Sequence, residues 1–354
     1  MRVVVNALPL RHGGGVSYLH QQLHAIAEVA PDIELHTLVS PWAVGLDQLP
    51  GTTEVVRVRS VAHRFAYEQV VLPFRRADLI YCPANFAPLF FSGPLVLTIH
   101  NPNYYGRGLE LPEVAASRPW WKVKANHWAI RRATTVVAIS ESMAEEVRET
   151  LPGLRNLRVI LSGNPEWPAV SEPVSGLPER FLLAFASMSP HKRIAETVEG
   201  WARSADRFPD APWLLVVGPI EEDTRRQCES AAGRHVDRLV LHGQVKERER
   251  MRWIFEHAEA LVSSSVLETF SMTPGEAASV GCPLVLSDLP VHREVTAGRA
   301  LFVAPGDVEG LADTLATRIY PGRADRTPWR WTTTWRDNAD QFVSLFRSLA
   351  KETR

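Results

Sequence analysis

The feature that most constrains the fold of this chain is a regular alternation of two kinds of segment. Short runs rich in Val, Leu and Ile recur between amphipathic stretches, and they lack the apolar–polar alternation of a half-exposed strand. Such runs are typical of parallel strands buried on both faces. Between the first two runs, apolar residues step by three and four from Val16 to Ala30, which predicts a helix with one apolar face. The alternation therefore predicts an α/β fold with doubly wound parallel sheets and right-handed crossovers.

The expected strands form two groups separated by a break. Residues 163–179 hold four prolines and two glycines, which is typical of an interdomain linker. We therefore predict a Rossmann-like domain over residues 1–165, a second over 166–335 and a terminal helix over 336–354. Ligands of open α/β sheets bind beyond the carboxyl ends of the strands, so we expect the two domains to face each other across a ligand-binding cleft. The expected strands are Arg2–Asn6, Ile33–Val39, Glu54–Val58, Asp78–Cys82, Pro94–His100, Thr134–Ser140, Leu157–Leu161, Phe181–Ala186, Trp213–Gly218, Arg238–Gly243, Ala260–Ser264 and Pro283–Asp288.

Composition narrows the class of protein. The chain has 354 residues, 45% of them hydrophobic and 22% charged, which suits two folded domains and excludes a disordered chain. Its 39 basic residues are balanced by 40 acidic ones, so nucleic acid is not the expected main partner. The three cysteines have no metal-ligand spacing, and neither a membrane-spanning run nor a secretory signal is present. We expect a cytoplasmic protein without a bound metal, whose oligomeric state the sequence leaves open.

A glycine run marks the first candidate binding element. Gly13, Gly14 and Gly15 follow the first strand and open the first helix. Their backbone can approach an anion closely, and a helix N-terminus offers unpaired N–H groups, although an ordinary βα turn would use the same residues. The run is not the dinucleotide fingerprint, because Tyr18 occupies the position of its third glycine.

Two glutamates form the densest signal of the chain. Glu268 and Glu276 have seven residues between them, and a helix is expected to begin between the two. Thr273 to Glu276 has the pattern of a capping box with proline at the first helical position, so Glu276 could serve only to cap the backbone. Glu268 follows a buried strand, where its carboxylate could accept hydrogen bonds from sugar hydroxyls. A glycosidase pair is disfavoured, because the capping box ties Glu276 to a helix start.

These motifs, in their order, resemble those of the family 4 retaining glycosyltransferases, which have the GT-B fold, and the likeness covers nearly the whole chain. In this family the terminal helix crosses back to the first domain. The matching motifs are the E-x7-E stretch with Ala277 and Gly281-Cys282-Pro283, the early glycine run, Ile139-Ser140-Glu141, Pro190-His191-Lys192, His242-Gly243-Gln244-Val245 and the terminal helix at Trp335.

The resemblance implies a donor site. Gly14 and Gly15 would contact the donor diphosphate through backbone N–H groups, and Lys192 would neutralise it. Glu276 would accept the ribose hydroxyls and Glu268 those of the donor sugar. The remaining implied donor-binding residues are Arg193, Val245, Phe270, Ser271 and Met272.

The resemblance also implies a catalytic role for His100 beside Glu268, near the donor sugar and the acceptor. Asn101, Tyr104 and Tyr105, which follow His100, are the expected acceptor-side residues. Three departures from the family pattern stand out. Ser187 replaces an arginine, Asn101 replaces the aspartate of a His-Asp pair, and Glu268-Thr269-Phe270-Ser271 replaces Glu-Gly-Phe-Gly.

The implied activity is transfer of a sugar, with retention of configuration, from a UDP-, GDP- or dTDP-sugar to a hydroxyl acceptor. The acceptor would be a glycan, a lipid-linked molecule or a small molecule, and the front-face mechanism would need neither metal nor cofactor. A GT-B sugar-nucleotide epimerase and a non-catalytic sugar-nucleotide-binding subunit remain as alternatives.

Residues 117–132 mix tryptophan with basic residues and leave two interpretations open. One is a helix at the inner membrane surface that serves a lipid-linked acceptor. The other is a half-buried helix with Trp121, Ala125, Trp128 and Ala129 toward the core.

Overall fold

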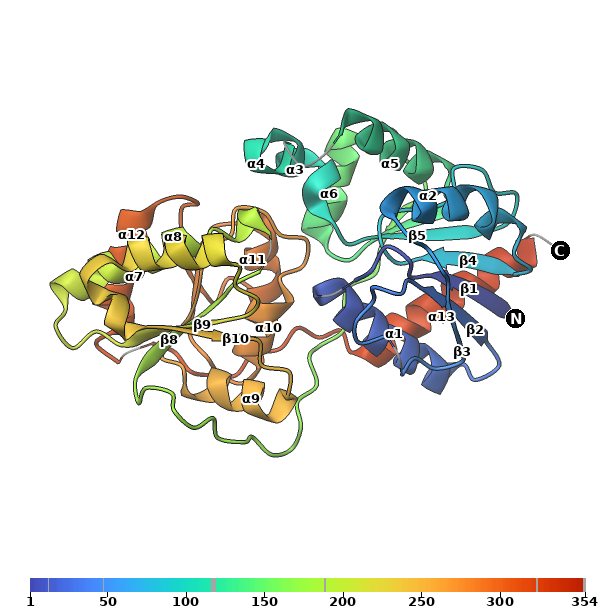
Figure 1. Ribbon diagram of the computed structural model, residues 1–354. Coiled ribbons are helices and arrows are strands. Elements are labelled where there is room, and N and C mark those ends of the chain that lie inside the picture. Colours follow the sequence, from blue (N-terminus) through green and yellow to red (C-terminus); the bar gives the residue numbers. More distant parts are fainter. Residues whose placement is uncertain (12, 47, 116–118, 188, 323, 353–354) are drawn as a thin grey trace. The chain divides into compact units, whose positions relative to one another are not determined.

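The computed structural model describes residues 1–11, 13–46, 48–115, 119–187, 189–322 and 324–352. The chain divides into two compact units (Figure 1). Met1–Gly163 and Thr333–Arg354 form the N-terminal unit, and Asn164–Thr332 forms the C-terminal unit. Each unit is built on one parallel sheet, so the predicted α/β architecture with two Rossmann-like sheets is confirmed.

The N-terminal sheet has seven strands in the order β3-β2-β1-β4-β5-β6-β7. All seven expected strands are found, with ends shifted by a few residues; the third begins at Thr52 and ends at Val55. Their bounds are β1 Arg2–Asn6, β2 Glu34–Val39, β3 Thr52–Val55, β4 Leu79–Cys82, β5 Leu95–Ile99, β6 Thr135–Ala138 and β7 Leu157–Val159. The α-helices of this unit are α1 Gly14–Val29, α2 Val61–Val70, α3 Gly106–Glu110, α4 Pro112–Ala115, α5 Trp120–Arg132, α6 Glu141–Thr150 and α13 Trp335–Glu352.

The terminal helix α13 belongs to the N-terminal unit. It packs along α1, and its Phe342 and Phe346 rings lie 5.4 and 5.5 Å from the ring of Tyr81 in β4. At its start, Trp335 packs edge-on against Tyr18 of α1 and covers Gly163, where a Cβ atom would lie 2.5 Å from the indole. The glycine is therefore required for the close approach of the tryptophan.

The C-terminal sheet has six strands in the order β10-β9-β8-β11-β12-β13. Their bounds are β8 Phe181–Phe185, β9 Trp213–Val217, β10 Leu239–Gly243, β11 Leu261–Ser263, β12 Leu284–Ser287 and β13 Leu301–Val303. The α-helices are α7 Ile194–Arg207, α8 Glu222–Ala232, α9 Arg248–His257, α10 Met272–Ser279, α11 Pro290–Thr296 and α12 Val308–Thr314. Strand β13 and helix α11 are not among the sequence-based predictions, because segments of three and seven residues are too short to show a periodic pattern.

Alternate residues of strand β8 enter two different cores, which explains why its sequence is apolar throughout. Leu182 and Ala184 pack with Trp201 of α7, whereas Phe181 and Leu183 pack with Phe255 of α9. This is the expected burial of a parallel strand covered by helices on both faces.

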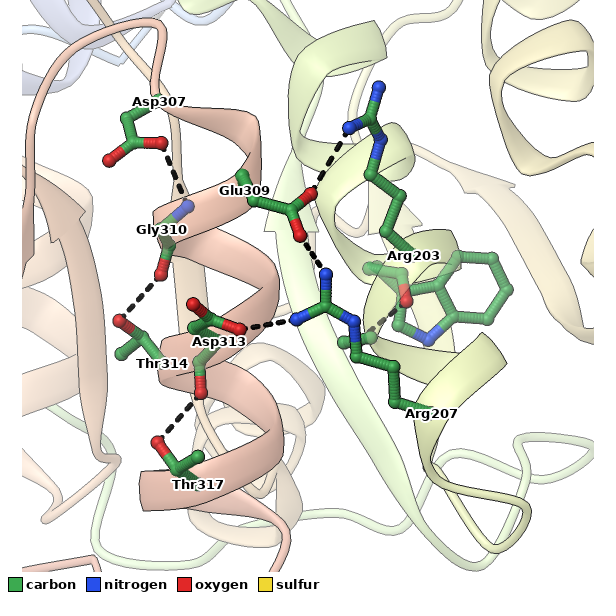
Figure 2. A network of polar contacts seen from close by, with 10 residues as sticks. Arg203, Arg207, Asp307, Glu309, Gly310, Asp313, Thr314 and Thr317 are labelled. Carbon is green, nitrogen blue, oxygen red and sulfur yellow. Dashed lines mark hydrogen bonds and ion pairs between the residues drawn. The ribbon is translucent and has the colours of Figure 1, made fainter.

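Charged side chains join helices α7 and α12 at the surface (Figure 2). Arg203 donates to Glu309 at 3.1 Å, and Arg207 pairs with both Glu309 and Asp313. Asp307 accepts the N–H of Gly310 at 2.8 Å and so caps the start of α12. Since the ion pairs are exposed, each contributes about 1 kcal/mol or less to stability.

The predicted capping box at Thr273 is wrong. Helix α10 begins at Met272, its N-cap residue is Ser271, and no side chain caps it. Gly275 instead faces Trp331, whose Cζ3 would lie 2.0 Å from a Cβ atom at that position. The helix thus begins at a residue that the local sequence pattern does not predict, and its first turn packs against this tryptophan. Because the Glu276 side chain does not cap the helix, it can make other contacts.

The expected core face of helix α5 is also partly wrong. Ala129 is buried as expected, but Trp121 and Trp128 are 45% and 37% exposed. The buried positions are instead Asn126, Ala129 and Ile130, since the Asn126 amide binds polar groups beneath the helix. Residues 117 and 118 of the segment lie outside the described residues.

Candidate functional site

Lys192 and Glu268 meet beyond the carboxyl ends of two adjacent strands. Strand β8 leads into a single helical turn, Pro190–Lys192, and β11, which pairs with β8, leads into the loop that carries Glu268. The backbone N–H of Val266 donates to the His191 carbonyl at 2.9 Å and ties the two loops together. Lys192 Nζ lies 2.5 Å from Glu268 Oε1. The structure therefore brings together two residues that are 76 positions apart in the chain.

The carboxyl group of Glu268 is held in its charged form. Burial raises its pKa, but the nearby ammonium group of Lys192 lowers it further, so the net shift is downward. The side chain is only 11% exposed. At neutral pH, Glu268 is therefore a buried carboxylate that can accept hydrogen bonds but cannot donate them.

His292 is a neighbour of this pair that the sequence analysis did not identify. It lies fully buried on α11, with Nδ1 2.7 Å from the Ser287 carbonyl oxygen. A carbonyl only accepts, so Nδ1 carries the proton that is donated, and burial lowers the pKa of the ring. We therefore treat His292 as a neutral ring beside Glu268. No short motif marked it, because α11 itself escaped prediction.

A small hollow adjoins the ion pair within the C-terminal unit. Lys192 and Glu268 contribute polar groups to its wall, and Thr273 and Pro274 line it from the first turn of α10. Residues of β8, β11 and α7 complete the lining, and they include the polar Thr197 and Ser263. The wall therefore mixes apolar side chains with polar ones, and Lys192 and Glu268 are the charged groups on it.

Ser271 adopts a backbone conformation that favours glycine. It has φ 58° and ψ 60°, the left-handed region, and immediately precedes α10. Its side chain is 7% exposed, and the Oγ atom has no hydrogen-bond partner among the described residues. Phe270 beside it packs edge-on against Trp331 with ring centroids 4.9 Å apart, whereas Met272 is the first residue of the helix.

Glu276 binds Arg248 instead of capping α10. Its Oε1 lies 3.4 Å from Arg248 Nη1, and Arg248 also donates to the Glu166 carbonyl at 2.7 Å and packs over the Trp167 ring. Burial raises the pKa of Glu276, which the arginine offsets only in part. Arg248 begins helix α9 and carries no motif of its own, so the sequence analysis missed it.

Two further predicted donor-site residues have other contacts. Arg193 is left-handed, with φ 48°, and its guanidinium pairs with Glu196 of α7. Val245 follows β10 and packs against the apolar cluster around Phe255. Ser187, at the position of the missing arginine, accepts the N–H of Ser189 at 3.2 Å and so shapes the turn before Lys192.

In the N-terminal unit, the glycine run opens helix α1 as predicted. Gly13 has φ 79°, and Gly14 and Gly15 are the first two helical residues. The helix has no side-chain cap and no acidic residue in its first turn. A Cβ at Gly14 would meet nothing within 4 Å, whereas one at Gly15 would lie 2.9 Å from Leu10. The N–H of Val16 already donates to the Gly13 carbonyl at 3.0 Å, so Gly14 and Gly15 are the residues of this turn whose N–H groups could meet an anion at the positive end of the helix dipole.

His100 lies against helix α1. Its ring packs edge-on against Tyr18 with centroids 4.2 Å apart, and its backbone N–H donates to Asn85 Oδ1 at 2.7 Å. Burial lowers the pKa of the ring to about 3, so His100 is neutral at physiological pH. The structure therefore brings His100 close to the helix that the glycine run begins.

The residues after His100 form an internally bonded loop. Asn101 donates its N–H to Asn85 Oδ1 at 2.7 Å and accepts the N–H of Asn103 at 2.9 Å. Tyr104 and Tyr105 are buried, and the Tyr105 hydroxyl donates to Asn126 of α5 at 2.5 Å. The acceptor-side role of Asn101, Tyr104 and Tyr105 stays a prediction. Because both tyrosines are buried, this role would depend on the backbone and shape of the loop more than on the two phenol groups.

No group of three or more His, Cys, Asp or Glu side chains with metal-ligand geometry is found among the described residues. Over the same part of the chain, no helix has the length and apolarity needed to cross a membrane.

The chain matches known glycosyltransferases. Residues 179–319 match the family model Glycosyl transferases group 1. The chain is 27% identical over 245 residues to glycogen synthase of Mycobacterium tuberculosis, a match covering 66% of this chain and 56% of that protein. It is 28% identical over 240 residues to the O-antigen chain mannosyltransferase RfbU of Salmonella typhimurium, covering 68% of this chain and 64% of the relative. The matches thus span less than two thirds of these curated relatives.

Solved structures share the fold along the whole chain. Sucrose-phosphate synthase from Thermosynechococcus elongatus superposes with a TM-score of 0.71 at 17% identity, covering 100% of this chain and 97% of the other. HepE of Anabaena, solved in complex with UDP-glucose, superposes with a TM-score of 0.68 at 18% identity, covering 99% and 98%. The two parallel-sheet units therefore form a GT-B fold.

Proposed function

We propose that this chain transfers a sugar from a nucleoside-diphosphate sugar to a hydroxyl acceptor, because residues 179–319 match the family model Glycosyl transferases group 1. The observation that carries the proposal is the ion pair of Lys192 and Glu268 at the carboxyl ends of β8 and β11. It combines a cation suited to a diphosphate with a carboxylate suited to sugar hydroxyls. HepE, which shares the fold, binds UDP-glucose, and this supports a nucleotide-sugar donor here.

Each residue has a role that its surroundings support. Lys192 stabilises the negative charge that builds on the departing diphosphate. Glu268 accepts hydrogen bonds from hydroxyl groups of the donor sugar. Glu276 accepts hydrogen bonds from the ribose hydroxyls, and Arg248 positions Glu276. His100 is neutral, so it contributes hydrogen bonding and shape near the sugar and does not act as a cation.

The reaction breaks the bond between the anomeric carbon and the diphosphate oxygen and forms a bond from that carbon to the acceptor oxygen. The acceptor proton passes to the leaving diphosphate on the same face, so that the product keeps the anomeric configuration of the donor. We propose a metal-independent reaction, because lysine and backbone amides supply the positive field that a metal supplies in other transferases.

A donor panel tests the proposal. The full chain is incubated with UDP-, GDP- and dTDP-sugars, with and without hydroxyl acceptors, in excess EDTA. We expect release of one nucleoside diphosphate and an NMR spectrum in which the product retains the donor configuration. Glu268→Gln should depress turnover while leaving nucleotide affinity nearly unchanged.

The same panel separates the alternatives. Isomerised sugar nucleotide without transfer would identify an epimerase, and nucleotide binding without turnover would identify a non-catalytic subunit. Activity that EDTA abolishes and magnesium restores would contradict the metal-independent mechanism.

A further inference from the structure

One side of helix α5 carries a cluster of aromatic rings, which we call the aromatic face: the exposed Phe90, Trp120, Trp121 and Trp128 and the half-buried Phe65. Trp120 is 71% exposed and Phe90 69%. Trp121 and Trp128 are seven residues apart, so they lie on one stripe of the helix. Phe65 of α2 packs edge-on against Trp121 at 6.1 Å, and Phe90 against Trp128 at 5.1 Å. The two ring pairs therefore join α5 to α2 on one side and to the loop that follows β4 on the other.

Each exposed tryptophan of the aromatic face has a cation over its ring. Lys124 lies 5.1 Å from the Trp120 ring, Lys122 lies 5.6 Å from Trp121, and Arg132 lies 5.7 Å from Trp128. Through these contacts the ammonium and guanidinium groups stay close to the exposed tryptophan rings. The surface is thus aromatic and cationic at once.

The segments that build this face carry no exposed carboxylate. Residues 119–133 contain four Lys and Arg and no acid, and residues 83–94 contain no charged residue. Residues 56–76 contain five arginines and a single acid, Glu68, which is 1% exposed and bound to Asn6 at 3.0 Å. In a chain whose formal net charge is −1, this is a strong local excess of positive charge.

We propose that the aromatic face docks on an anionic lipid bilayer. Tryptophan rings favour the level of the lipid headgroups, and lysine and arginine beside them pair with anionic phosphates while their alkyl stems stay in the apolar zone. Aromatic residues and arginine are also enriched at protein–protein interfaces, but lysine is depleted there, and two of the three cations over the tryptophan rings are lysines, which favours the bilayer. The association is peripheral and reversible, with the rings seated at the interface.

The inner face of the same helix holds the loop after His100. The Asn126 amide accepts from Tyr105 and donates to the Asn85 carbonyl, both at 2.5 Å, and His127 Nε2 lies 2.8 Å from the Tyr104 carbonyl. Asn85 Oδ1 in turn accepts the N–H groups of His100 and Asn101. Helix α5 thus joins the membrane-docking side to the candidate acceptor side. The consequence for the acceptor, which rests on the proposed function, is that it is an amphiphile whose hydroxyl is presented at the membrane surface.

Vesicle binding tests the docking surface without reference to activity. The full chain is sedimented with phosphatidylcholine vesicles and with vesicles that also contain phosphatidylglycerol, at about 0.1 M and about 0.5 M salt. We expect binding to the anionic vesicles that weakens with salt, together with a blue shift of tryptophan emission. Trp120→Ser with Trp128→Ser, and separately Lys122→Glu with Lys124→Glu, should each lower binding on the order of tenfold or more.

Matched controls lie on the C-terminal unit. Trp213, which is 37% exposed, provides Trp213→Ser, and the exposed helix α8 provides Arg225→Glu with Arg226→Glu. Both control variants should bind vesicles as the unchanged chain does. Equal losses in control and face variants, or no binding to anionic vesicles, would overturn the proposal. It would also fail if the face variants instead abolished self-association, or if they abolished binding of a single-stranded oligonucleotide while vesicle binding persisted.

Measuring donor hydrolysis without vesicles tests the proposed transferase activity independently of membrane docking. The face variants should hydrolyse the donor, and glycosylate a short soluble acceptor, at the unchanged rate, while losing transfer to an acceptor embedded in vesicles. Vesicle binding without turnover of any donor would leave the docking surface intact and remove the proposed transferase activity.

Discussion

Lys192 Nζ lies 2.5 Å from Glu268 Oε1, so the cation assigned to the donor diphosphate is already paired with the carboxylate assigned to the donor sugar. An ammonium has three protons to donate, and one cation can therefore serve both the carboxylate and an incoming phosphate. A diphosphate that enters beside Glu268 needs this lysine in place, because two anions would otherwise repel each other in a half-buried site. Donor binding and Glu268 ionisation are thereby linked through Lys192.

The first prediction concerns Lys192. Lys192→Ala should weaken binding of the matching nucleoside diphosphate by about 10- to 100-fold, the cost of losing one charge-assisted contact. Affinity for the nucleoside should change little, and calorimetric titration compares the two ligands. Arg203→Ala on α7, whose guanidinium pairs with Glu199 and Glu309, is the matched control and should bind both ligands normally. Equal losses for nucleoside and diphosphate would place Lys192 outside the phosphate site.

The same pair predicts a pH effect on stability. The pKa of Glu268 is lowered in the folded chain, so its contribution is present above the unfolded value of about 4.5 and is lost as the pH falls through the lower folded pKa. Lys192→Ala should remove this contribution and leave an uncompensated buried carboxylate. Adding Glu268→Gln should then recover stability without recovering diphosphate affinity, which urea unfolding and titration would measure separately. A double variant less stable than Lys192→Ala would contradict the coupling.

For Ser271, the backbone conformation and the hydroxyl group predict opposite effects of one substitution: a gain in stability and a loss of donor affinity. Ser271→Gly should raise the free energy of unfolding by roughly 0.5–1 kcal/mol, since glycine adopts φ 58° without steric cost. If the buried Oγ contacts the donor, the same variant should bind nucleotide sugar more weakly. Ala297→Gly is the control, because Ala297 has φ 48° at the end of α11 and should show only the gain in stability. A Ser271→Gly chain with unchanged unfolding energy would contradict the strain argument.

The sequence was sufficient to predict the fold because every expected strand is an apolar run bounded by turn residues. Such a run can be recognised without knowing which other segments pack against it. It failed where tertiary contacts decide. The Thr273–Glu276 pattern satisfies a capping box, but packing against Trp331, more than fifty positions later, accompanies a different helix start. Likewise, the aromatic residues of α5 suggested a core face, whereas the buried positions include Asn126, which holds the Tyr105 hydroxyl.

Among the site residues, the motifs predicted those with characteristic neighbours in the chain. Lys192 and Glu268 belong to short patterns, and the structure pairs them. Arg248 and His292 touch or approach the two glutamates but stand in segments without a recognisable spacing. Their proximity arises only from the order of strands and helices in the sheet.

The fourth prediction separates a binding role for Glu276 from a capping role. Since Glu276 contacts Arg248 and caps nothing, Glu276→Gln should weaken nucleoside binding without the loss of about 1 kcal/mol that removal of a cap causes. Its raised pKa means that the unchanged chain loses stability as the pH rises from about 4.5 through the folded pKa. The variant should escape that loss. Ser140→Ala is the comparison, because the Ser140 hydroxyl does cap α6 by accepting the Met143 N–H at 3.1 Å.

The last prediction concerns Glu146, which lies under the start of helix α3. Its carboxyl group packs against Gly106, where a Cβ atom would lie 3.0 Å from Oε2, and burial raises its pKa to about 7. The folded chain therefore holds a proton here between about pH 4.5 and 7 that the unfolded chain does not, so the free energy of unfolding should fall as the pH rises through this window. With allowance for the partial exposure of the group, the change is on the order of 1–2 kcal/mol. Glu146→Gln should flatten this slope in urea unfolding measured from pH 5 to 8, whereas Glu145→Gln, exposed on the same helix, should keep it. If the free energy of unfolding of Glu146→Gln depended on pH as that of the unchanged chain does, the Glu146 carboxyl would be ionised in the folded chain, in spite of its packing against Gly106.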